Sequence, residues 1–118
     1  MQLRFFDAQF RAYPLVADYY AAQIHDPDPN IAERARLLRT LVQTIEYTNL
    51  DLHPDITVGT QLLALTFARA QIGGIGVSAW SGEYLIEYHI RTITGEKRFG
   101  DVSTACVCLQ ALLRQLGE

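Results

Sequence analysis

Apolar and polar residues alternate on both sides of Ser81 and Gly82, and this pattern predicts a β-hairpin over residues 75–93. With those two residues as the loop, Val77 faces Ile86 and Trp80 faces Glu83. One face of the hairpin is then apolar and contains Ile75, Val77, Ala79, Tyr84, Ile86, Tyr88 and Ile90. The other face contains Gly74, Gly76, Ser78, Trp80, Glu83, Leu85, Glu87, His89 and Arg91. A shift of one residue would mix the two sets, so the pattern supports this register.

Two helices are predicted before the hairpin, with a break at residues 26–29, where two Asp-Pro pairs push the chain out of helical geometry. Pro14 fits the first position of a helix that extends to Ile24. In the second helix, Asn30 is expected to cap the N terminus and Glu33 to complete a capping box. Its apolar stripe follows three- and four-residue spacing, ends before residues 53–55, and contains Ile31, Leu38, Leu41, Val42, Ile45 and Leu52.

Residues 61–72 allow two interpretations. Their composition favours a helix, whereas a strand would place Leu63, Leu65 and Phe67 on one side. After the hairpin, residues 94–97 predict a four-residue turn into a short strand at Arg98 and Phe99, with Phe99 opposite Thr92.

A final helix, capped by Asp101 or Ser103, closes the chain and would bury Val102, Cys106, Leu109, Leu113 and Leu116. The sequence therefore predicts a single α+β domain over residues 1–118. Its N-terminal helices precede an antiparallel meander of three or four strands, and the C-terminal helix packs on the sheet.

Composition narrows the classes of function. The 118 residues suit one domain, and an apolar fraction of 49% with 19% charged residues is typical of a globular chain. A net charge of −3 disfavours nucleic-acid binding, since arginines cluster only at Arg34, Arg36 and Arg39. The first residues lack a secretory-signal pattern, and the charge-free stretches are too short to cross a membrane. Both cysteines lie in one predicted helix, which favours a reducing cytoplasm.

Two short motifs have the spacing of a nucleotide site and of a metal site, but the secondary structure predicted around them does not suit either site. Residues 74–79 match G-x-G-x-x-A, but a dinucleotide site needs a helix after the glycines, and here a strand follows. The glycines instead favour a flat strand whose backbone can be approached closely. Cys106 and Cys108 are two residues apart on a helix and point in different directions, so they are expected to be packed thiols. No cofactor and no metal is predicted from either motif.

Glu87 and His89 are the one pair with catalytic potential, because residues two apart on a strand project from the same side. A carboxylate and an imidazole so placed can share a proton or bind a metal, with His25 or His53 as further ligands. The alternative hypothesis is therefore a small metal- or ligand-binding enzyme that uses Glu87 and His89. The competing interpretation is a solvated face with cross-strand charge pairs.

The leading hypothesis is a non-catalytic protein–protein interaction module. Trp80, Leu85 and Tyr47 are large groups at positions predicted to be partly exposed, and apolar groups rimmed by charge commonly mark a binding surface. Coverage of that surface by residues 3–10 or by the first helix is the competing explanation. The partner would contact the outer face of the hairpin, at Trp80, Glu83, Leu85, Glu87, His89 and Arg91.

The acidic balance suits a basic partner protein, and a homodimer joined through the same face is the second possibility. The strand–turn–helix from Glu83 to Leu116 resembles that of some bacterial immunity proteins, although no motif specific to them is present. Immunity proteins, antitoxins and secretion chaperones are small, acidic partner-binding proteins. The hypothesis of an interaction module therefore includes an immunity-type, antitoxin-type or chaperone-like protein.

Overall fold

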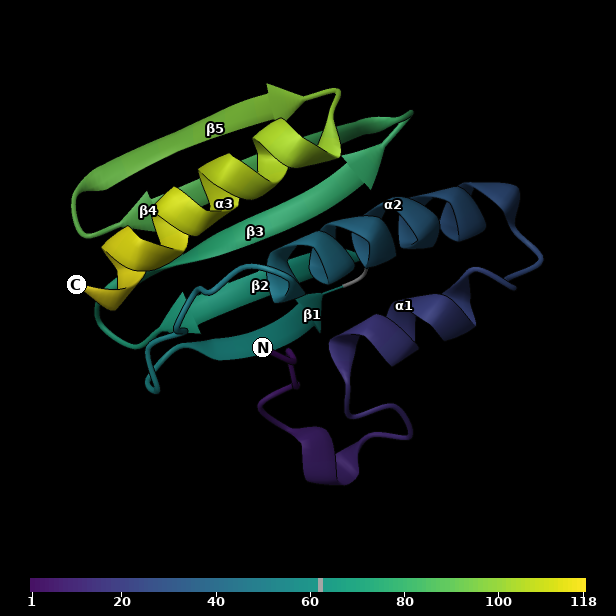
Figure 1. Cartoon of the computed structure of the whole chain (residues 1–118), viewed down its shortest axis with the longest axis horizontal. Helices are drawn as coiled ribbons and strands as arrows, with labels where there is room; N and C mark the ends of the chain where they lie inside the picture. Colours follow the sequence, from purple (N-terminus) through teal and green to yellow (C-terminus); the bar gives the residue numbers. More distant parts are fainter. Residues whose placement is uncertain (62) are drawn as a thin grey trace.

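A computed structural model describes residues 1–61 and 63–118. Its sheet is an antiparallel meander in which each strand pairs with its neighbours in sequence (Figure 1). The α+β class is confirmed, but the predicted three or four strands are corrected to five among the described residues: β1 (Thr57–Gln61), β2 (Ala64–Arg69), β3 (Gly73–Trp80), β4 (Glu83–Ile90) and β5 (Ile93–Phe99).

The predicted hairpin is confirmed in β3 and β4, including its register. Val77 pairs with Ile86, and Trp80 pairs with Glu83 across the loop. Ser81 and Gly82 both have positive φ angles, of 50° and 79°, as expected for a tight two-residue hairpin turn whose twist matches that of the strands. The apolar set predicted for one face is buried apart from Tyr88, which is partly buried and packs against the core.

The turn after β4 differs from the prediction. It lies at Arg91 and Thr92, and the whole of residues 93–99 forms β5, with Phe99 facing Tyr84 instead of Thr92. Gly95 pairs with Tyr88, and a Cβ at position 95 would lie 2.5 Å from the Tyr88 hydroxyl oxygen. This glycine therefore makes room for an aromatic ring in the middle of an edge strand.

The interpretation of residues 61–72 as a strand is correct for the part that forms β2. Leu65 and Phe67 are buried on the helix side of the sheet, whereas Leu63 precedes the strand and Leu62 lies outside the described residues. The sequence did not predict β1. The N-terminal segment accompanies this edge strand, because the Phe6 N–H donates to the Val58 carbonyl oxygen at 2.9 Å.

The two N-terminal helices, α1 (Val16–Gln23) and α2 (Pro29–Glu46), follow a short 3-10 turn, η1 (Ala8–Phe10). The predicted Asn30 cap of α2 is wrong: Asp28 is extended, and its side chain accepts a hydrogen bond from the Asn30 N–H at 2.9 Å. Pro29 explains why the helix begins earlier than predicted. Proline suits the first helical position because the N–H it lacks would have no partner there and because its ring holds φ at a helical value. The helix also ends before Leu52, which packs on the core from a loop.

Helix α3 (Val102–Gly117) is capped by Asp101, which accepts from the Thr104 N–H at 3.0 Å, so the first of the two predicted caps is confirmed. Helices α2 and α3 lie on the same face of the sheet (Figure 1), and their apolar stripes share one core with the strands. None of the described helices is both long and apolar enough to cross a membrane.

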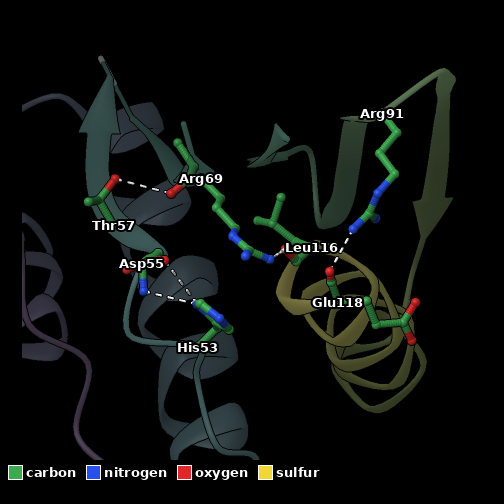
Figure 2. A network of polar contacts seen from close by, with 8 residues as sticks. His53, Asp55, Thr57, Arg69, Arg91, Leu116 and Glu118 are labelled. Carbon is green, nitrogen blue, oxygen red and sulfur yellow. Dashed lines mark hydrogen bonds and ion pairs between the residues drawn. The ribbon is translucent and has the colours of Figure 1, made fainter. Parts of the chain in front are cut away.

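Two arginines from the sheet bind the C-terminal end of α3 (Figure 2). Arg69 on β2 donates to the Leu116 carbonyl oxygen at 3.0 Å, and Arg91 donates to the carbonyl oxygens of Gln115 and Glu118 at 3.1 and 2.7 Å. The last carbonyls of a helix lack intrahelical partners and carry partial negative charge. These guanidinium groups therefore fix the end of α3 to one end of the sheet.

Tyr20 makes alkaline stability a direct test of the packing of α1. Its side chain is fully buried, with the hydroxyl 3.5 Å from the Thr60 Oγ1, and burial raises the pKa of Tyr20 to about 12. Because this pKa exceeds the unfolded value of about 10, the stabilisation is complete below pH 10 and is lost as the pH rises towards 12. We expect urea denaturation to show that the loss over that range is about 2 kcal/mol smaller in Tyr20→Phe than in the wild type, while the buried Tyr84, whose pKa is also raised, contributes equally in both.

Tyr47 provides the control, because its side chain is 91% exposed. The Tyr47→Phe protein should lose as much stability between pH 10 and pH 12 as the wild type. An equal alkaline loss in Tyr20→Phe and in the wild type would contradict the assignment to Tyr20.

Candidate functional site

The face of β3, β4 and β5 that points away from α2 and α3 is open. We call it the outer sheet face; it consists of Gly74, Gly76, Ser78, Trp80, Glu83, Leu85, Glu87, His89, Thr94, Glu96 and Arg98. Trp80 is 61% exposed, the charged residues of β4 are also exposed, and Leu85 is half-buried.

The N-terminal segment covers a different part of this side of the sheet. The Phe6 ring lies 3.8 Å from the position that a Cβ on Gly59 of β1 would occupy. Gly59 pairs with Thr66 on β2, and β2 is itself two strands away from β4 in the sheet. The segment of residues 3–10 therefore covers the β1 edge, and five of the six predicted contact residues stay uncovered on β3 and β4.

Arg91, the sixth predicted contact residue, does not belong to the outer sheet face. It lies in the β4–β5 turn with a φ angle of 56°. Its guanidinium group donates hydrogen bonds to carbonyl oxygens at the C-terminal end of α3 (Figure 2). The prediction extended the alternation of β4 one residue beyond Ile90, the last residue of the strand. A turn changes the direction of the side chain, so the period of two no longer applies there.

Two carboxylates face each other in the middle of the outer sheet face. Glu87 on β4 is paired directly with Glu96 on β5, and Gly76 lies on the other side of Glu87. Like charges at directly opposite positions are destabilising. Neither side chain takes part in an ion pair among the described residues. Two exposed acidic residues thus occupy directly opposite positions on this surface.

Trp80 is held at one end of this face by a residue from α2. The Arg34 guanidinium carbon lies 4.8 Å from the centre of the Trp80 ring, and the Arg34 Nε–H donates to the Ala79 carbonyl oxygen at 2.9 Å. A hollow of about 330 Å³ adjoins the indole ring and is also lined by Glu83, Leu85 and Arg98. Trp80 is therefore an exposed aromatic group that is contacted on its ring by Arg34 and lies next to a hollow.

Glycines form the floor of the outer sheet face beside β4. A Cβ on Gly76 would meet no atom within 4 Å, so the space above the β3 backbone is open at this position. The neighbouring positions on β2 and β3 are Thr66 and Ser78, both small. An approaching chain can therefore come closer to the backbone here than above an ordinary strand.

Four residues of this surface were missed from sequence. Thr94 and Glu96 were assigned to a turn and Arg98 to a two-residue strand in another register, so none was placed on this face. Arg34 belongs to the one arginine cluster visible in the sequence, but contact with Trp80, 46 positions later, has no local signal.

The alternative catalytic pair, Glu87 and His89, does share the outer sheet face. Among the residues that the structure describes, no three His, Cys, Asp or Glu side chains come together so that they could hold a metal ion. Cys106 and Cys108 are free thiols that pack on the core, as predicted, and burial raises the pKa of each. An enzymatic role for Glu87 and His89 stays a prediction.

Comparisons of this chain with protein-family models, with curated proteins and with solved structures give no significant match. The assignment of a function therefore depends on the geometry and chemistry of the surface itself.

Proposed function

We propose that this chain is a non-catalytic protein–protein interaction module of the cytoplasm that binds a basic partner protein through the outer sheet face. The observation that carries the proposal is the pair of facing carboxylates, Glu87 and Glu96, beside an open glycine floor and an exposed tryptophan. A folded protein gains no stability from such a pair. A partner that supplies positive charge between the two carboxylates would remove their repulsion.

The charge of the surface favours a basic partner. Among the described residues, three carboxylates, on Glu83, Glu87 and Glu96, belong to this surface, against two guanidinium groups, on Arg98 and on the Arg34 that contacts Trp80. A lysine or arginine side chain placed between Glu87 and Glu96 would gain two charge-assisted contacts. Complementary charge also speeds the encounter of the two proteins and discriminates against acidic competitors.

The shape of the surface favours an anchor at Trp80. Tryptophan is enriched among the residues that dominate binding energies, especially when it is already fixed before binding. The contact with Arg34 restricts the indole ring while leaving more than half of it exposed. The partner would thus contact the ring and the adjoining hollow, and would extend over Gly76 towards Glu87.

A homodimer through this face is less favourable. In a two-fold symmetric contact the same surface patch is used by both copies. The acidic outer sheet face would then meet its own carboxylates, and like charges across an interface are costly. The proposal is therefore a different, basic protein, as expected for a partner of an immunity-type, antitoxin-type or chaperone-like protein.

The test combines Trp80→Ala with Leu85→Ser. We expect the double variant to lose at least about 30-fold in affinity for the partner, the scale at which a single anchor residue is called a hot spot. The free energy of unfolding should fall by no more than about 1 kcal/mol, because both side chains are partly exposed. Affinity capture from a lysate of the source organism supplies the partner, and calorimetry with the purified pair measures the affinity.

Tyr47→Ala is the matched control, since Tyr47 is a 91% exposed aromatic residue at the end of α2, away from this face. It should capture the partner as well as the wild type does. The proposal fails if the double variant retains full affinity, if the captured partner is acidic, or if the double variant unfolds, which would make these residues part of the core.

A further inference from the structure

An apolar groove of about 680 Å³ lies between α3 and β5, on the helix side of the sheet. Ile93 on β5 and Val107 on α3 both line it and remain 57% and 64% exposed. Side chains of β4, β5 and α3 form most of its wall, among them Tyr88, Phe99 and Leu112. We call it the α3–β5 groove.

Lys97 provides the one formal charge among the residues that line the groove. It pairs with Ile86, which is fully buried, so position 97 lies on the helix side of the sheet. Lys97 takes part in no ion pair among the described residues. The Lys97 side chain is exposed to solvent beside the apolar residues of the groove, in a protein that is acidic as a whole.

The groove is also polarised along its length. Helix α3 runs antiparallel to β5 (Figure 1), so Ser103 lies near Phe99 and Gln115 lies towards Ile93. Ser103, Thr104 and Lys97 therefore lie towards one end, whereas Ile93, Leu112 and Gln115 lie towards the other and the Tyr88 ring lies between them. Burial raises the pKa of the Cys108 thiol, and the nearby Lys97 ammonium group acts to lower it, so the cation and the thiol belong to the same part of the groove.

We propose that the α3–β5 groove binds a small acidic amphiphile, with its carboxylate on Lys97 and its aliphatic chain along Tyr88, Leu112 and Ile93. Its volume falls within the range of about 300–1,000 Å³ that is usual for small-molecule sites. Lys97 and Ile93 are separated by about 13 Å along β5, at about 3.3 Å per residue, which accommodates an extended aliphatic chain of medium length. Apolar contacts favour the tail, and Lys97 selects the charged head.

A second copy of the chain fits this site less well. Glu96, Lys97 and Arg98 are consecutive charges on an edge strand, and such charges oppose pairing with another strand. In an antiparallel pairing of two β5 strands about their centre, Glu96 would face its own counterpart. The inference is independent of the proposed function, because the groove and the outer sheet face lie on opposite sides of the sheet.

The experiment compares dodecanoate with dodecan-1-ol by isothermal titration calorimetry, below the micelle concentration of each. We expect the wild type to bind one dodecanoate, and Lys97→Met to weaken that binding at least about tenfold while changing the affinity for dodecan-1-ol by less than about twofold. Ala111→Phe places a ring in the groove from the exposed side of α3 and should abolish binding of both compounds.

Arg98→Met is the matched control, because it removes a neighbouring positive charge on the opposite side of the sheet, and it should bind dodecanoate as the wild type does. Circular dichroism confirms that each variant is folded. Absence of dodecanoate binding to the wild type, or equal binding by Lys97→Met, would overturn the proposal. A concentration-dependent dimer that Ala111→Phe dissociates, without dodecanoate binding, would identify a second copy as the occupant and overturn it as well.

Discussion

Replacement of Gly73 with alanine is expected to lower the free energy of unfolding by about 3 kcal/mol or more. Gly73 begins β3 with a φ angle of 151°, and a Cβ at this position would lie 1.9 Å from the His89 carbonyl oxygen and 2.9 Å from the Ile90 Cα. Both atoms belong to the backbone of β4. They cannot move away without separating the two strands at the pair formed by Gly73 and Ile90. Urea denaturation at neutral pH measures the loss.

Gly82→Ala separates steric clash from backbone strain. Gly82 also has a positive φ angle, of 79°, but a Cβ there would meet no atom within 4 Å. Alanine at position 82 should therefore cost only the strain of a left-handed residue, about 1–2 kcal/mol. If Gly73→Ala is no more destabilising than Gly82→Ala, this result would contradict the close contact between the backbones of β3 and β4 at this end of the hairpin.

Gly76→Thr is expected to weaken partner binding at least about 100-fold, equivalent to about 2.8 kcal/mol, without weakening the fold. A Cβ at position 76 would meet no atom within 4 Å, so the side chain of threonine begins in open space on the exposed face. Glycine within a strand is unfavourable by roughly 0.5–1 kcal/mol, so the free protein should become slightly more stable. The new side chain would occupy the floor of the outer sheet face, where the partner is proposed to approach the β3 backbone.

Gly100→Ala is the control for the removal of a glycine. Gly100 lies between β5 and α3, where a Cβ also meets open space. This variant should bind the partner with unchanged affinity. Full affinity in Gly76→Thr, measured by calorimetry with the same partner, would show that nothing approaches this strand closely.

The β3–β4 hairpin could be predicted from sequence because two independent signals coincide there. Ser81 and Gly82 tolerate the positive φ angles of a tight turn, and the alternation around them fixes which side chains are buried. The apolar stripe and the Asp101 cap of α3 were predictable for similar reasons, since spacing and capping are local.

The missed elements depend on contacts between distant residues. Gly95 is surrounded by residues that are common in turns, so the sequence around it predicts a turn. Its place within β5 is explained by the Tyr88 ring, which occupies the space that a Cβ would need. Asp28 and Asn30 are both good caps, and the position of Pro29 decides between them. The short edge strand β1 has a pattern too brief to distinguish from a loop, and it is defined by its pairing with β2.

The same limit applies to the candidate site. Five of the six predicted residues lie on the outer sheet face because the period of two holds throughout β3 and β4. Arg91 was misplaced because it is the first residue of a turn. The pairing of Glu87 with Glu96 and the contact of Arg34 with Trp80 each join separate elements, so only the tertiary structure reveals them.

The most direct test of the proposed interaction surface is an NMR titration of the ¹⁵N-labelled protein with the purified partner, which maps the contact without any substitution. The largest backbone amide shifts should fall on β3 and β4, at Gly74, Gly76, Ser78, Leu85 and Glu87, with the Trp80 indole N–H shifting as well. Shifts confined to α1, α2 or the α3–β5 groove, with these amides unmoved, would contradict the account.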